Sequence, residues 1–296
     1  YFLATRPAFL AVTLVGCCIG LASAHSDRVG LSLVAAVATI SLALIAHAAI
    51  NVLNDYYDAL NGTDAINTER VFPFTGGSRF IQNGVLSSRQ TLVYGAMLMA
   101  IVALGGLWLM SISHARLLYF GLAGIFIGWA YSAPPFKLNS RGLGELCVWA
   151  GFALITVGAD FVQRGAWSWR PLAAAASYAL LVTNILYMNQ FPDRSADALS
   201  GKRHWVVRLQ PQYARWGYVL IAALAYGWLI GAIALGRLPA ATAIALLAAL
   251  LSARAARDLL RWAQQPAKLA SAIKLTIAAA ISHGMLLSAS LLLSPN

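Results

Sequence analysis

Residues 51–58 read NVLNDYYD and residues 189–197 read NQFPDRSAD, and each stretch follows a long apolar run. In both stretches an Asn precedes an Asp by four positions. These two acidic clusters, with Asp64 and Glu69 after the first, hold six of the ten acidic residues of the chain. An acidic side chain at the centre of a membrane helix costs about 2.5–3.5 kcal/mol. Carboxylates gathered at two places therefore indicate that a cation, most simply a metal ion, collects there.

The rest of the chain is apolar enough to lie in a membrane. Of its 296 residues, 60% are hydrophobic and 10% are charged, and the mean hydropathy is +0.70. A soluble domain carries about 25% charged residues. A helix needs about 17–25 apolar residues to span a bilayer. Runs close to or within that length occur at 8–24, 31–53, 91–112, 116–133, 143–162, 171–191, 214–235, 239–253 and 270–293. We therefore predict an all-α, polytopic membrane protein with nine transmembrane helices.

Basic residues are unevenly divided between the two sides of such a bundle. With nine spans, the N-terminus shares one side with the loops after the second, fourth, sixth and eighth helices. That side holds 16 of the 21 basic residues, and the other side holds Arg28, Arg116, Arg164, Arg170 and Arg237. By the positive-inside rule the crowded side, with the N-terminus and both acidic clusters, is cytoplasmic. The net charge of +11 thus points to anionic lipid head groups, notably for the run 254–268, and not to nucleic acid.

The chain is predicted to form one domain over residues 1–296, because no linker or low-complexity tract divides it. Two connecting segments, about 54–90 and 189–213, are longer and more polar than the others, and each contains an acidic cluster. Their shared pattern indicates an ancient internal duplication. Since the chain opens at Tyr1 without a Met, we expect its natural N-terminus to lie upstream.

The spacing inside each cluster suits metal coordination. Residues three or four apart share one face of a helix. Each cluster therefore forms a stripe. The first consists of Asn51, Asp55 and Asp58, with Asn54 at its edge, and the second of Asn189, Asp193 and Asp197. Two facing stripes would make a cage of carboxylate and amide oxygens. Such ligands suit Mg²⁺, which usually binds together with substrate phosphates.

Basic residues predicted on the same side indicate that an anion binds beside the metal. They are Arg79, Lys137, Arg141, Lys202 and Arg203. Clustered Asp with clustered Arg and Lys is typical of metal-bridged diphosphate binding, in which cations neutralise a leaving group. The turn at 76–78, GGS, can offer backbone N–H groups to phosphate. Only a diphosphate with a long lipid tail requires a membrane bundle, so we predict an isoprenyl diphosphate substrate.

Together these residues resemble the UbiA family of intramembrane aromatic prenyltransferases. Residues 54–58, NDYYD, followed by Asp64 resemble its first Asp-rich motif, and residues 193–197, DRSAD, its second. Residues 131–137, YSAPPFK, resemble a Tyr/Lys segment after the fourth helix, and residues 201–209, GKRHWVVRL, resemble the end of the second motif. The resemblance covers the whole chain. It implies nine helices surrounding a central cavity, with both motifs on the cytoplasmic side.

The resemblance implies Mg²⁺-dependent transfer of an isoprenyl chain from a polyprenyl diphosphate to an aromatic acceptor. Two or more Mg²⁺ ions would be held by Asp55, Asp58, Asp64, Asp193 and Asp197. The catalytic set would be Asp55, Asp58, Asp193, Asp197, Arg79 and Lys137. Substrate would be bound by Asn51, Asn54, Asn189, Tyr131, Lys202, Arg203 and Arg141. Nearby aromatic rings would shield an allylic cation, with Tyr56, Tyr57, Phe72, Phe74 and Tyr131 as candidates.

The acceptor is the least constrained part of this prediction. The spacing from Asp58 to Asp64, followed by GGSR at 76–79, resembles the 1,4-dihydroxy-2-naphthoate enzymes of menaquinone synthesis more than the 4-hydroxybenzoate enzymes, which stay an alternative. Prenyl length and oligomeric state stay open. We expect a bacterial inner-membrane location with the site toward the cytoplasm. The rival classes are a transporter, whose carboxylates lie near the midplane, and a lipid phosphatase.

Some polar residues have simpler interpretations. His47 and His283 are predicted to hydrogen-bond between helices, and Asp160 to be interfacial or to pair with a neighbouring helix. Glu145 begins a helix, where an acid interacts favourably with the helix dipole. His204 lies close enough to the second cluster that a phosphate contact stays open.

Overall fold

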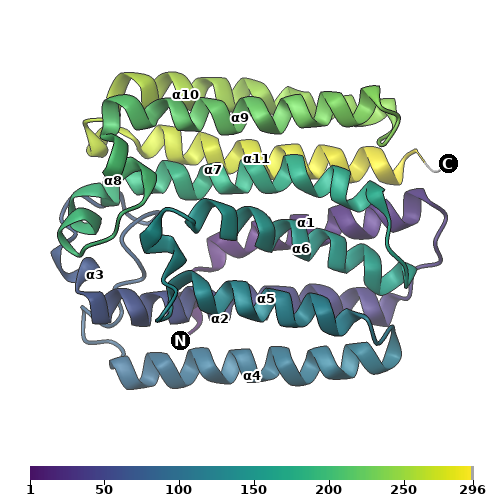
Figure 1. The fold of residues 1–296 in the computed structure, drawn as a ribbon, viewed down its shortest axis with the longest axis horizontal. Coiled ribbons are helices and arrows are strands. Elements are labelled where there is room, and N and C mark those ends of the chain that lie inside the picture. The colour runs from purple at the N-terminus through teal and green to yellow at the C-terminus, as the bar shows by residue number, and fades with distance from the viewer. Residues whose placement is uncertain (295–296) are drawn as a thin grey trace.

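The structure, a computed structural model, describes residues 1–294, which form helices and contain no strand. Most connections between the helices are short, and the longest joins α3 to α4 over residues 67–87. In Figure 1 the long helices run side by side along the longest axis of the molecule. In chain order the α-helices and 3₁₀ helices (η) are η1 Phe2–Thr5, α1 Pro7–Ser26, α2 Leu33–Asn61, α3 Thr63–Ile66, α4 Ser88–Ile112, α5 Leu117–Ser132, η2 Leu138–Arg141, α6 Gly144–Arg164, α7 Trp169–Leu199, α8 Trp205–Leu209, α9 Pro211–Ala234, η3 Ala240–Ala248, α10 Ala249–Trp262, η4 Pro266–Lys268 and α11 Ala270–Leu292.

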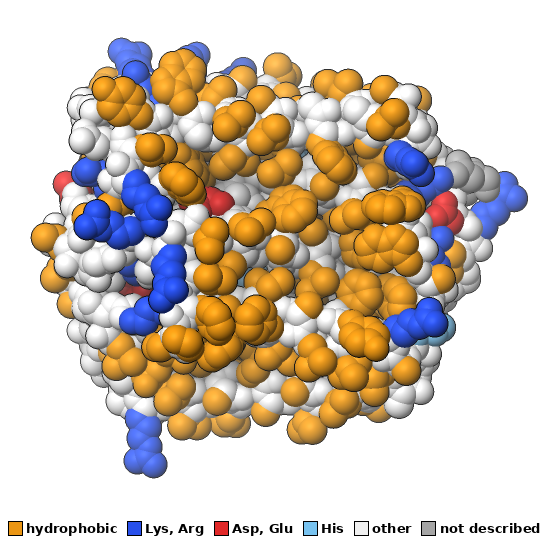
Figure 2. Space-filling view, viewed as in Figure 1, with side chains coloured by type: hydrophobic (Ala, Val, Ile, Leu, Met, Phe, Trp, Pro, Cys, Tyr) orange, Lys and Arg blue, Asp and Glu red, His pale blue; other side chains and the backbone are white. Residues whose placement is uncertain are grey.

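Within residues 1–294, seven helices are long and apolar enough to cross a membrane: α1, α2, α4, α6, α7, α9 and α11. The other two predicted spans also lie on helical segments. However, α5 has only 16 residues, which is short for a membrane crossing. The run at 239–253 is divided between the 3₁₀ helix η3 and the start of α10 and is not one long α-helix. The all-helical, membrane-spanning prediction is confirmed, while nine crossings stays a prediction. On the face drawn in Figure 2, hydrophobic side chains cover the middle and Lys and Arg gather toward the two ends, as a bilayer requires.

Two helices extend well beyond their apolar runs. The run predicted at 31–53 belongs to α2, which continues to Asn61, and the run at 171–191 belongs to α7, which continues to Leu199. The acidic clusters therefore lie on helix ends, and the segments predicted as loops at 54–90 and 189–213 are partly helical. Hydropathy falls at the first polar residues, whereas backbone hydrogen bonding continues. Helix α2 stops only where Gly62 adopts a left-handed conformation, a common helix C-terminus.

Helix α7 occupies the centre of the bundle. It packs against α1, α6, α9 and α11 and is buried along most of its length. The buried hydroxyl of Tyr178 donates to the backbone carbonyl of Val12, which ties α7 to α1. Helix α2 packs against α1, α4, α5 and α6. Both α2 and α7 end at the same end of the bundle, on the left in Figure 1, so the two acidic clusters lie near each other.

Helices α1 and α6 approach each other closely at Gly20. A Cβ atom added to Gly20 would meet the backbone carbonyl oxygen of Thr156 and lie 2.8 Å from the Cβ of Ala159. Small residues are the usual means by which membrane helices pack backbone to backbone. Glycine at this position therefore fixes the separation of α1 from α6, and α6 lines the groove described below.

We expect Gly20→Ala to lower the free energy of unfolding by about 1–3 kcal/mol, the usual range for overpacking. The added methyl group overlaps a backbone atom of α6, which cannot turn aside as a flexible side chain can. Thermal unfolding of the purified protein in detergent measures the effect. Gly106→Ala in α4 is the matched control, because nothing lies within 4 Å of a Cβ there. Equal melting temperatures for the two variants would contradict the close contact.

Candidate active site

A polar cavity of about 130 Å³ lies between the ends of α2 and α7. Its lining includes two cationic side chains, Arg6 and Lys202, against four carboxylates, those of Asp58, Asp64, Asp193 and Asp197. The carboxylates outnumber the cations, so the cavity attracts further positive charge. Both acidic clusters contribute to it, as the sequence predicts.

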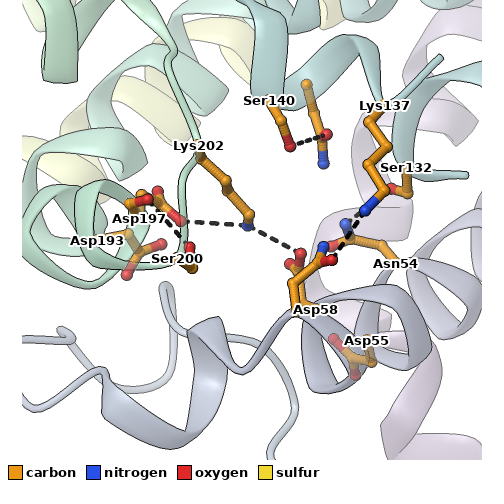
Figure 3. Close-up of polar contacts among 12 residues, drawn as sticks. Asn54, Asp55, Asp58, Ser132, Lys137, Ser140, Asp193, Asp197, Ser200 and Lys202 are labelled. Atoms are coloured by element: carbon orange, nitrogen blue, oxygen red, sulfur yellow. Dashed lines mark hydrogen bonds and ion pairs between the residues drawn. The ribbon is translucent and has the colours of Figure 1, made fainter. Parts of the chain in front are cut away.

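Lys202 joins the two acidic clusters. Its Nζ lies 2.8 Å from Oδ1 of Asp58 and 3.1 Å from Oδ1 of Asp197, and Figure 3 shows it between them. Burial alone would lower the pKa of Lys202, but the two carboxylates outweigh burial and raise it. Lys202 therefore stays charged. His204 is also buried, and its Nε2 lies 3.0 Å from the second oxygen of Asp197.

The carboxylates of Asp55 and Asp193 have other partners. Arg6 donates to Asp55, which also accepts the backbone N–H of Ser78 at 3.2 Å. Asp193 accepts from the side-chain amide of Asn67 at 2.6 Å. Asp55 does not line the cavity, and Figure 3 shows it apart from the Asp58–Lys202 pair. The connection that follows α3 thus binds to both acidic clusters.

Asp64 lies beneath a turn of two glycines. Gly76 and Gly77 have φ of 76° and 70°, which suits glycine, and a Cβ on Gly77 would lie 2.5 Å from Oδ2 of Asp64. Burial, together with the nearby Asp58 carboxylate, raises the pKa of Asp64 to about 7. The turn is predicted to offer N–H groups to phosphate, but in this structure the Gly76 N–H faces the Asp193 carboxylate at 3.4 Å.

Several buried oxygens around the cavity have no hydrogen-bond partner among residues 1–294: Thr63 Oγ1, Asp64 Oδ2, Asn67 Oδ1, Asn189 Oδ1 and Gln190 Oε1. Each unpaired buried polar atom costs about 1–3 kcal/mol, so this set indicates a ligand that pairs with oxygen. Hydroxyl, carboxylate and amide oxygens fit Mg²⁺. Across the described part of the chain, no three acidic, His or Cys side chains form a group ready for a metal. The five predicted metal ligands are therefore not gathered in one group here.

The remaining predicted residues divide between the cavity and its surroundings. Asn54, Tyr131 and Asn189 line the cavity, whereas Asn51 lines the neighbouring groove. Four basic residues are not among the cavity-lining residues: Arg79, Lys137, Arg141 and Arg203. Three of them donate elsewhere, Arg79 to the Asp64 carbonyl at 2.6 Å, Lys137 to Asn61 at 3.1 Å and Arg141 to the Pro135 carbonyl at 2.8 Å. Arg203 is exposed.

The cavity also has lining residues that were not predicted as site residues, among them Arg6, Asn67 and Gln190. Asn67 stands three positions after Asp64, and Gln190 stands beside Asn189, where it donates to Glu145 at 2.8 Å. Their positions next to the acidic clusters could have identified these two residues from the sequence. Arg6 lies 49 positions before its partner Asp55, and no local pattern connects them.

A larger groove of about 570 Å³ adjoins the polar cavity and is bounded by α2, α4, α5 and α6. Its lining is almost wholly apolar and contains no charged side chain among the described residues. Tyr131, at the end of α5, lines both the groove and the polar cavity. The site therefore combines an oxygen-rich end with a long apolar space.

Curated relatives of this chain carry naphthoate- and naphthoquinone-related names. It is 29% identical over 219 residues to 2-carboxy-1,4-naphthoquinone phytyltransferase from Synechocystis sp., covering 70% of this chain and 64% of that protein. It is 30% identical over 177 residues to 1,4-dihydroxy-2-naphthoate octaprenyltransferase from Mycobacterium tuberculosis, covering 60% and 58%. The chain thus spans less than two thirds of the length of these two relatives.

Solved structures share the fold. A UbiA homolog from Aeropyrum pernix K1 matches with a TM-score of 0.68 at 18% identity, covering 93% of this chain and 96% of that one. A UbiA homolog from Archaeoglobus fulgidus bound to DMAPP and Mg²⁺ matches with a TM-score of 0.61 at 16% identity, covering 96% and 97%. The UbiA prenyltransferase family profile matches residues 9–278. With most of its length matched in this way, the chain belongs to the UbiA prenyltransferase family.

Proposed function

We propose that this protein transfers an isoprenyl chain from a polyprenyl diphosphate to 1,4-dihydroxy-2-naphthoate and releases diphosphate. The observation that carries the proposal is the oxygen-rich cavity that shares Tyr131 with an apolar groove. A diphosphate head group requires cations, and a prenyl tail requires an apolar space. The names of the relatives support the naphthoate acceptor. A UbiA homolog of the same fold binds DMAPP with Mg²⁺.

Mg²⁺ fits the donors around the cavity. The carboxylates of both acidic clusters, with Asp64, would hold the ions, and the unpaired amide oxygens of Asn67 and Asn189 would support them. When bound, Mg²⁺ neutralises charge that develops on the departing diphosphate. The proposed ligands are Asp55, Asp58, Asp64, Asp193 and Asp197.

Residues of the chain would act on both products of C1–O bond cleavage, the diphosphate and the allylic cation. Lys202 and Arg6, which line the cavity, stabilise the diphosphate as the C1–O bond breaks and its electron pair leaves with the oxygen. Tyr131 lies where cavity and groove meet, so its ring can face the allylic cation. An electron-rich carbon of the acceptor then attacks C1. That carbon afterwards loses a proton or, where it carries a carboxylate, CO₂.

We place the site at the cytoplasmic side of a bacterial inner membrane. The support is the excess of Lys and Arg in the connections on the side of the acidic clusters, which the positive-inside rule assigns to the cytoplasm. A transporter is the alternative class, but its carboxylates are expected near the midplane, whereas here they lie at the ends of α2 and α7. Turnover of radiolabelled prenyl diphosphate against uptake into vesicles separates the two classes.

The acceptor is tested by mass spectrometry of products from a panel that includes 1,4-dihydroxy-2-naphthoate and 4-hydroxybenzoate. We expect prenylated naphthoate product, with loss of CO₂ if the attacked carbon carries the carboxylate. A prenylated 4-hydroxybenzoate as the main product would overturn the naphthoate assignment and leave prenyl transfer standing.

We expect Asp58→Asn and Asp193→Asn each to lower kcat by about 100-fold or more, the usual loss when one electrostatic stabiliser is removed. Each change removes a charge from the cavity while the side-chain volume stays nearly the same. Transfer of radiolabelled prenyl groups measures the loss. Asp258→Asn in α10 is the matched control, because that carboxylate pairs with Arg257 and Ser271 instead. Near-normal transfer by both cavity variants would sink the metal-binding role.

We expect Lys202→Gln to make the protein unusually dependent on Mg²⁺ for stability. Removing the ammonium leaves two buried carboxylates facing each other, and breaking a buried pair costs about 3–5 kcal/mol. The melting temperature in EDTA should fall, and added Mg²⁺ should raise it more than in the parent protein. Arg203→Gln, one position along and exposed, is the control. If Mg²⁺ raised the melting temperature equally in the parent protein, Lys202→Gln and Arg203→Gln, the result would contradict the bridging role of Lys202.

A further inference from the structure

The apolar groove contains a small group of polar atoms that have no hydrogen-bond partner in the described part of the chain. Four side chains with oxygen or nitrogen line it: Thr39, His47, Asn51 and Tyr131. Thr39 is satisfied within its own helix, because its hydroxyl donates to the Ala35 carbonyl at 2.7 Å. His47 Nε2, Asn51 Oδ1 and Tyr131 Oη have no hydrogen-bond partner among residues 1–294, and none of the three is sealed from the groove.

The orientation of His47 is fixed from the other side of its ring. Nδ1 lies 2.7 Å from the hydroxyl of Thr13, a buried residue of α1. Phe152 of α6 packs edge-on against the ring, with centroids 5.6 Å apart and an interplanar angle of 88°. The prediction that His47 bonds between helices is thus correct for one nitrogen only. The second nitrogen, Nε2, is left to the groove.

These polar atoms lie beside the reacting end of the groove. His47 and Asn51 are four residues apart on α2 and share a face, which continues to Asp55 and Asp58. One helical turn advances about 5.4 Å, so His47 lies one turn farther from the oxygen-rich cavity than Asn51. Tyr131 stands at the junction itself.

The chemistry of the two proposed substrates decides which one meets these atoms. A prenyl chain contains only carbon and hydrogen, and it would leave three polar atoms buried and unpaired, at about 1–3 kcal/mol each. A hydroxylated aromatic ring has apolar faces and hydrogen-bonding groups at its edge. No charged side chain of the described residues lines the groove, so a carboxylate on the ring must point toward Lys202 and Arg6 in the polar cavity.

We infer that His47 Nε2 binds a ring hydroxyl of the aromatic acceptor, and that Asn51 and Tyr131 complete an acceptor subsite where the groove meets the cavity. The inference rests on the proposed prenyl transfer and adds the position and orientation of the second substrate. Thr13 acts as a positioning residue, because it holds the imidazole through Nδ1.

The first experiment compares kinetic constants for the two substrates. In His47→Leu, the KM for 1,4-dihydroxy-2-naphthoate should rise about tenfold, the usual scale for one lost hydrogen bond to a substrate. The KM for the prenyl diphosphate should stay within about twofold. His47→Gln keeps a side-chain amide within the groove and should recover part of the loss. Thr39→Val is the matched control, because it removes a groove hydroxyl that is already paired.

The second experiment blocks a ring hydroxyl of the substrate instead. Methylation of the hydroxyl that His47 binds should lower kcat/KM for the acceptor about tenfold in the parent enzyme. In His47→Leu, the same methylation should leave kcat/KM almost unchanged. The assignment of His47 would be overturned if methylation of each hydroxyl lowered kcat/KM equally in both enzymes. It would also be overturned if His47→Leu raised the KM values of both substrates equally. Failure of the parent enzyme to prenylate any aromatic acceptor would instead overturn the proposed function. Melting temperatures of both His47 variants show whether the fold is intact.

Discussion

The buried ion pairs of Lys202 hold the two acidic clusters of this protein together. Asp58 lies near the end of α2 and Asp197 near the end of α7, and no hydrogen bond between those two helix ends replaces the ammonium. Both carboxylates contact the same ammonium group, so without a cation they would repel each other strongly in this buried place. The bundle can therefore close at this end only around positive charge. Lys202 supplies part of that charge, and the remaining carboxylates and unpaired oxygens leave room for more.

This constraint also explains why the polar cavity is small and the groove beside it is large. Charged groups must be surrounded by partners at short range, so the connection after α3 folds over the clusters and binds Asp55 and Asp193 through Ser78 and Asn67. The groove carries no charge and needs no such cover. Its walls are the apolar faces of α2, α4, α5 and α6. A molecule with a charged head and an apolar tail matches this division.

The sequence predicts the parts that follow from periodicity and misses the parts that join distant segments. The i, i+4 spacing of Asn51 and Asp55 correctly places the first cluster on a helix. Hydropathy ends that helix too early, at 53, because the last two turns carry polar residues. The contacts from Arg6 to Asp55 and from Asn67 to Asp193 join residues 49 and 126 positions apart. Such contacts depend on how whole helices pack, which local pattern does not encode.

Helix α2 relates the two halves of the site to each other. Over eleven positions its inner face passes from His47, in the apolar groove, to Asp58, at the oxygen-rich cavity, a rise of about 16 Å at 1.5 Å per residue. In the proposed reaction, this one rigid element would set the separation between the acceptor hydroxyl and the diphosphate. The same proposal puts the reacting carbon between them, beside Asn51 and Tyr131. A helix fixes that spacing better than a loop would, because its rise is set by its own hydrogen bonds.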